Sequence, residues 1–140
     1  MPATVETLTS KTIALKYDAP SDILIAEWPH VTEGNIVELK SSMELLLSYS
    51  RESKVKHLLI DVRNSEVIIP SAEYNSLLNW FILELTDTNL RKIARVNPSG
   101  YVRKNVLDKT EIDVYKNDYS VVFEEYNNYK EAYCWLNLPV

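Results

Sequence analysis

Apolar and polar residues alternate along a short segment near the start of the chain. Over residues 12–17, every second residue is Ile, Leu or Tyr, which is typical of a strand with one exposed face. The turn-forming sequence Asp-Ala-Pro-Ser separates this segment from a second apolar run at 23–28. We therefore expect an antiparallel hairpin. Residues 1–10 show no such pattern, and we expect them to be loose.

Helical periodicity begins after this hairpin. Apolar residues recur every three or four positions, first in a segment preceded by Thr32, which we expect to be its N-cap, and again after Pro70. Four helices are expected. The first covers 33–50, the second starts at Ser71, the third covers about 100–116, and the fourth starts at Asn127 or Asn128.

Short apolar runs lie between these helices and predict strands at 55–62, 93–96 and 119–124. In the first of these runs, Leu58-Leu59-Ile60 is apolar without alternation, as expected when both faces of a central parallel strand are covered. The element order predicts a layered α/β fold. Its mixed sheet is expected to have about five strands, mostly parallel with an antiparallel N-terminal edge strand, and about four helices. At 140 residues, the chain is expected to form a single domain over 1–140.

Composition excludes several classes of function. The net charge of −5 disfavours a non-specific nucleic-acid surface or an anionic-membrane surface. The sequence contains neither a signal-peptide pattern nor an apolar run long enough to span a bilayer. We therefore expect a soluble cytoplasmic protein without nucleic-acid or membrane partners.

Scarce residue types exclude further chemistry. The only glycines, Gly34 and Gly100, are too far apart for a dinucleotide fingerprint, a phosphate-binding loop or a nucleophile elbow. Cys134, His30 and His57 are the only cysteine and histidine residues, which disfavours a zinc site. Cys134 is expected to be a small buried apolar residue. We expect no metal, no cofactor and no enzymatic activity, with a carboxylate site for magnesium left open.

The candidate site follows the strand at 55–62. Ligands of open α/β sheets gather beyond the carboxyl ends of parallel strands. The residues expected there, which we interpret as partner-binding residues, are Asp61, Arg63, Asn64, Ser65 and Ser71. Asp61 is expected to accept hydrogen bonds from the loop that follows it.

Ser71 has two interpretations. A serine before a helix caps it by accepting a backbone N–H. A phosphorylated serine there would meet free N–H groups and the positive end of the helix dipole, and would add 1.5 to 2 negative charges, by a rough general figure. We therefore name Ser71 both as the expected cap and as the phosphorylation candidate.

The segments 56–64 and 68–71 together resemble the anti-sigma-factor antagonist (STAS) family. In that family, a parallel strand with an acidic or amide residue leads through a loop to a serine at a helix N-terminus. The ending, Phe123-Glu124-Glu125-Tyr126 followed by Glu131-Ala132-Tyr133-Cys134-Trp135-Leu136, resembles the SpoIIAA-like branch.

This resemblance implies a STAS/SpoIIAA-like fold and a bacterial, non-catalytic regulatory module that binds a protein of kinase or regulator type. Phosphorylated members carry an acidic residue, a first serine and a glycine around the site. Ile69, Pro70 and Ala72 stand at those positions here.

Two residues of the second helix have two interpretations. Trp80 and Leu83 lie off the apolar face of that helix, so they are either covered by a neighbouring helix or exposed as a homodimer or partner surface.

The alternative function is a small apolar-ligand or lipid-binding domain. Trp28 and Trp80 could line a pocket, and lipid-transfer (CRAL-TRIO) domains look distantly similar to STAS-like domains.

Overall fold

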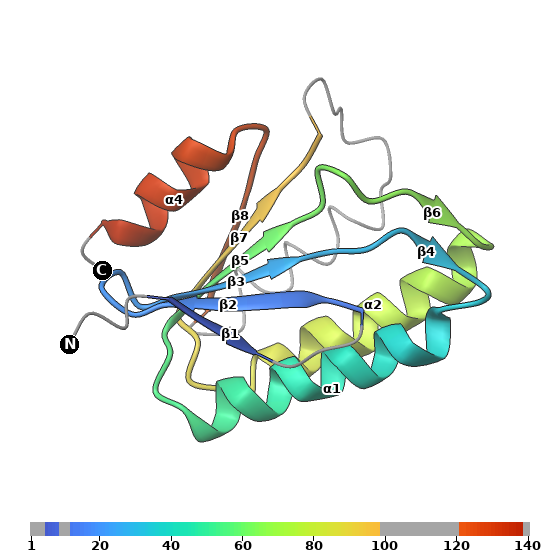
Figure 1. Cartoon of the computed structure of the whole chain (residues 1–140), viewed down its shortest axis with the longest axis horizontal. Helices are drawn as coiled ribbons and strands as arrows, with labels where there is room; N and C mark the ends of the chain where they lie inside the picture. The colour runs from blue at the N-terminus through green and yellow to red at the C-terminus, as the bar shows by residue number, and fades with distance from the viewer. Residues whose placement is uncertain (1–4, 9–11, 99–120, 139–140) are drawn as a thin grey trace.

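The structure is a computed structural model and describes residues 5–8, 12–98 and 121–138. Six strands form the main sheet (Figure 1). In spatial order they are β1 (Val5–Leu8), β2 (Ala14–Asp18), β3 (Ile23–Glu27), β5 (His57–Asp61), β7 (Lys92–Val96) and β8 (Val122–Tyr126). The pairings from β1 to β3 are antiparallel, and those from β3 to β8 are parallel. The predicted mixed, mostly parallel α/β sheet is confirmed.

The first strand corrects one expectation. Residues 1–10 were expected to be loose, yet Val5–Leu8 form β1 and pair with β2 along its whole length, from Val5 opposite Asp18 to Leu8 opposite Leu15. The sheet therefore has six described strands instead of about five. Pairing to an existing strand overrides the weak local pattern of these residues.

Helices cover both faces of the sheet. α1 (Ile36–Glu52) and α2 (Ser71–Leu85) lie on one face, and α4 (Tyr129–Asn137) lies on the other (Figure 1). The helix predicted at about 100–116 falls outside the described residues. No helix within the described residues is long and apolar enough to cross a membrane.

The start of α1 differs from the prediction. Asn35, and not Thr32, is the N-cap residue. Thr32 instead belongs to a short strand, β4 (Val31–Thr32), and its backbone N–H donates to Asn35 Oδ1 at 2.8 Å. The Asn35 side chain thus closes the turn that leads from the strand into the helix.

The central strand β5 contributes to two apolar layers. Leu58 and Ile60 pack in the layer under α1 and α2, whereas Leu59 packs with Ala132 and Leu136 of α4. This explains the run of apolar residues without alternation.

The prediction that Cys134 is buried is wrong. In α4, residues 132 and 136 face the sheet, and Cys134 is exposed.

A second, two-stranded sheet was not predicted. β4 pairs in parallel with β6 (Val67–Ile68). It lies at the end of the molecule where α1 and α2 begin (Figure 1). The segment between β5 and α2 therefore contains a paired strand and is not a direct strand-to-helix loop.

Candidate functional site

Asp61 ends β5 and is held by the loop that follows it. Its carboxylate belongs to a residue only 5% exposed. Arg63 Nε donates to Oδ1 at 2.9 Å, and an Arg63 Nη donates to Oδ2 at 2.8 Å. The backbone N–H of Arg63 also donates to Oδ1 at 3.1 Å. The predicted hydrogen bonding of Asp61 to the adjoining loop is confirmed, in the two-pronged form that arginine and carboxylate favour.

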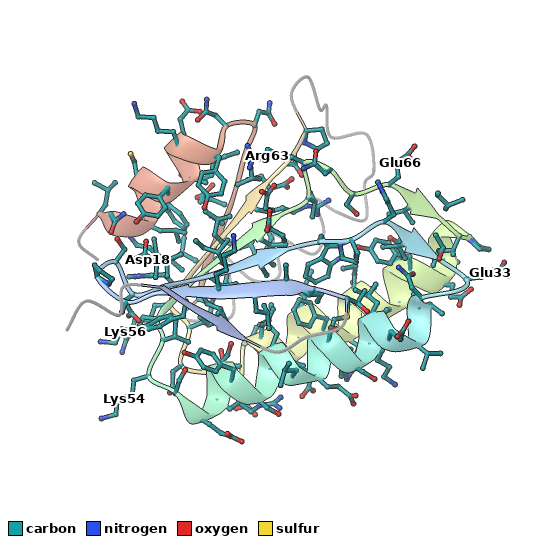
Figure 2. The ribbon with its side chains drawn as sticks, viewed as in Figure 1. Asp18, Glu33, Lys54, Lys56, Arg63 and Glu66 are labelled. Atoms are coloured by element: carbon teal, nitrogen blue, oxygen red, sulfur yellow. The ribbon has the colours of Figure 1, made fainter. Side chains whose placement is uncertain are left out.

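The other side of the Arg63 guanidinium faces α4. Arg63 Cζ lies 4.9 Å from the ring centroid of Tyr129, in the first turn of that helix. The hydrogen bonding that Arg63 donates to Asp61 is the main reason that the pKa of Arg63 is raised. Burial, followed by the charge of Asp61, raises the pKa of Tyr129. Asp61, Arg63 and Tyr129 therefore join the end of β5 to α4, and Figure 2 shows Arg63 beyond the end of that strand.

We predict that Tyr129 ionises above the ordinary tyrosine value of about 10. Its folded pKa lies above the unfolded value, so the stability it contributes is present below pH 10, approximately, and is lost as the pH rises through the folded pKa. The measurement is the tyrosinate absorbance of wild type minus that of Tyr129→Phe. A difference curve with its midpoint at or below about 10 would contradict the prediction.

The loop after Arg63 is anchored on the segment that precedes β4. Ser65 Oγ donates to the Pro29 carbonyl at 2.6 Å. The backbone N–H of Glu66 donates to His30 Nδ1 at 3.0 Å, and its carbonyl accepts from Val31 N–H at 2.8 Å. The Ser65 side chain thus holds the loop in place, whereas Asn64 is exposed on the same loop.

Ser71 is the first residue of α2, so its predicted place at a helix N-terminus is confirmed. The N-cap position belongs to Pro70, which forms no side-chain cap, and the prediction that Ser71 is the cap is therefore wrong. The start of α2 lies next to β6, away from the Asp61–Arg63 pair (Figure 1). The structure does not bring Ser71 together with that pair.

Trp80 and Leu83 do not form one exposed patch. Trp80 is partly buried against the core, and Lys40 Nζ of α1 lies 5.5 Å from its ring centroid. Leu83 is 51% exposed. For Trp80, the structure therefore favours coverage by the neighbouring helix.

An exposed apolar surface that the sequence analysis missed lies at the end with β6. We define the β6 surface as Val37, Val67 and Ile68, which are 77%, 45% and 62% exposed. Val37 belongs to the first turn of α1, which follows β4. Glu33 and Glu66 are exposed at the same end (Figure 2). The available signal was the run Val67-Ile68-Ile69, which is unusually apolar for a loop.

A small cavity lies between the sheet and α2. Its volume is about 40 Å³, and its walls include Trp28, Tyr74, Leu78, Phe81, Arg95 and Phe123. Two of these lining residues are hydrogen-bonded to each other, since Trp28 Nε1 donates to Tyr74 Oη at 2.9 Å. The predicted pocket residue Trp28 lines this cavity, but Trp80 is not among its lining residues. The cavity is far too small for a lipid.

Within the described residues, no group of three His, Cys, Asp or Glu side chains could hold a metal ion.

In sequence, this chain matches no protein-family model and no curated protein. In structure, it is similar to an uncharacterized protein from Shewanella loihica PV-4, described as a member of the DUF3478 family with a SpoIIAA-like fold. The two chains are 15% identical, the similarity covers 92% of this chain and 98% of that chain, and the TM-score is 0.49. The SpoIIAA-like fold named in that description is said of that protein.

Proposed function

We propose that the chain is a non-catalytic regulatory module that binds a protein partner through the β6 surface. The observation that carries the proposal is the exposure of Val37, Val67 and Ile68 at one end of the molecule. Exposed apolar side chains that are gathered and fixed in place are typical of interaction sites. The contacts of Ser65 and Glu66 with the segment before β4 hold the loop that leads into β6 in place, so little ordering entropy is lost there on binding.

The backbone of β6 supports the same proposal. β6 pairs with β4 on one side, and it has no second strand partner among the described residues. An open edge of this kind accepts an extended segment as an added strand, with main-chain hydrogen bonds for affinity and side-chain contacts for specificity. Glu33 and Glu66 favour a segment that carries basic residues. The partner is therefore an extended, partly basic stretch of another protein.

Ser71 supplies a switch for this surface. It follows Ile68 by three positions and begins α2. A phosphoryl group on Ser71 would be stabilised by the positive helix end and would add negative charge to the end of the molecule that carries β6. We expect phosphorylation to strengthen the binding of a basic partner. Ser76, exposed on the same helix, is the matched control position.

The test is a double substitution, Val67→Asp with Ile68→Asp, compared with Val122→Asp. Val122 is 43% exposed and lies on β8, the last strand in the order of the main sheet, whereas β6 belongs to the separate two-stranded sheet. The variants are expressed with a tag in the native host, and bound proteins are quantified by mass spectrometry. We expect the double variant to lose its partner at least about tenfold, because truncated central contacts each cost 1 kcal/mol or more, approximately. The control should retain it.

Two outcomes would contradict the proposal. Equal recovery of the same proteins by wild type, the double variant and Val122→Asp would show that binding does not use the β6 surface. Recovery of this chain alone, with a dimer in light scattering that the double variant abolishes, would make a second copy the occupant in place of a different protein.

A further inference from the structure

The backbone at β6 faces opposite ways at two neighbouring residues. At Glu66, the N–H donates to His30 Nδ1 at 3.0 Å, and the carbonyl accepts from Val31 N–H at 2.8 Å. Both backbone groups of Glu66 therefore point toward the segment that contains β4. Along an extended chain, the N–H and C=O of one residue point to one side, and those of the next residue point to the other. The N–H and C=O of Val67 therefore point away from β4, to the open edge of β6.

The side chains of this segment alternate between two faces. Val67 is paired with Val31, which is fully buried, so the Val67 side chain lies on the face that is turned toward the core. Glu66 and Ile68 flank Val67 and lie on the opposite face. Both are exposed, Ile68 to 62%. A carboxylate and an apolar side chain thus lie two positions apart on one face of the open edge.

We propose that the partner segment pairs with the backbone of Val67 and carries a basic and an apolar side chain two positions apart. This inference rests on the strand addition proposed above. When one partner residue lies opposite Val67, its two neighbours lie beside Glu66 and Ile68. A lysine or arginine suits the position beside the carboxylate, and a valine, isoleucine or leucine suits the position beside Ile68. The spacing is the same for a parallel and an antiparallel segment, and only the order of the two side chains differs.

The probe is a pair of short synthetic peptides of equal composition. In the first, Ser-Thr-Arg-Thr-Val-Thr-Arg-Thr-Ser, an arginine lies two positions from the valine on each side, so the peptide can bind in either direction. In the second, Ser-Thr-Thr-Arg-Val-Arg-Thr-Thr-Ser, the arginines are adjacent to the valine and point to the opposite face of a strand. Nitrogen–proton NMR spectra of the protein follow the backbone amide signals of Val67 and Ile68 during each titration.

The first peptide should shift both amide signals saturably and bind at least about threefold more tightly than the second, the general value of one matched cross-strand pair. Equal binding of the two peptides at these amides would overturn the spacing but would leave β6 as the proposed partner surface. Absence of shifts with either peptide would overturn the strand addition as well. The double substitution described above then decides separately whether a partner uses the β6 surface in another way.

Two substitutions at one position test the backbone contact. Val67→Ala and Val67→Pro both remove the valine side chain, but only proline also removes the N–H. Proline is tolerated in an edge strand where the N–H faces outward, so the pairing of β6 with β4 should persist. Val67→Pro should bind the first peptide at least about threefold more weakly than Val67→Ala, the general value of one hydrogen bond. Equal binding by the two variants would overturn the assignment of the Val67 N–H.

Glu66→Gln tests the basic position without changing the backbone of residue 66. The variant should bind the first peptide at least about twofold more weakly than wild type, because an opposite-charge cross-strand pair is lost. Its binding of a third peptide, with glutamine in place of both arginines, should equal that of wild type. Equal losses for the two peptides, or no loss for either, would overturn the pairing of the basic side chain with Glu66, even if Val67→Pro failed to fold.

Discussion

Phe81→Ala is expected to lower the free energy of unfolding by about 3–5 kcal/mol. Phe81 is 1% exposed and belongs to the apolar layer between the sheet and α2. Its ring centroid lies 5.7 Å from that of Trp28. The substitution removes the aromatic contact and leaves a void beside the existing cavity, which the surrounding strands cannot close.

Urea unfolding measures this loss, and Leu83→Ala is the matched control. Leu83 lies two residues later on the same helix and is 51% exposed. Its truncation should cost less than about 1 kcal/mol, since little apolar area is removed from the core. Similar losses in the two variants would contradict the packing of α2 described here.

Arg63→Ala is expected to lower the free energy of unfolding by about 2–3 kcal/mol. Of the hydrogen bonds that the described residues make to the buried Asp61 carboxylate, the substitution leaves the one from the backbone N–H of residue 63. The Arg63 side chain is 43% exposed, so water compensates part of the loss, and the effect should be smaller than for a fully buried pair.

The cause can be separated from lost packing. Adding Asp61→Asn to Arg63→Ala removes the unpaired charge and should recover part of the stability. Absence of any recovery of stability in the double variant would show that the carboxylate charge is not the cause.

The parts of the fold that were predictable depend on local patterns. The uninterrupted run Leu58-Leu59-Ile60 identified the central strand, because covering both faces requires apolar residues at every position. The start of the last helix was also predictable to within a residue: Asn128 is its N-cap, and the Asn128 side chain accepts from Glu131 N–H at 3.1 Å. β1 was missed because its structure depends on pairing with β2, which no local pattern records.

The same distinction applies to the candidate site. The rule that ligand sites follow parallel strands located Asp61 and its loop, and the partner Arg63 lies only two residues away. The β6 surface was missed because β6 is defined by pairing with β4, which lies far from it in sequence. The burial of Lys92 was missed for a similar reason, because it depends on a contact between residues far apart in sequence. Lys92 is 6% exposed, and its Nζ donates to the Leu138 carbonyl at 2.7 Å, at the end of α4.

Photochemical cross-linking from position 68 tests the proposed partner surface most directly. A photoreactive phenylalanine analogue replaces Ile68 in one form of the protein and Val122 in another, both exposed on strands. In intact cells of the native host, we predict one dominant cross-linked partner from position 68, joined through an extended basic segment, and none in common from position 122. Absence of any adduct from position 68, or the same adducts from both positions, would contradict the proposal.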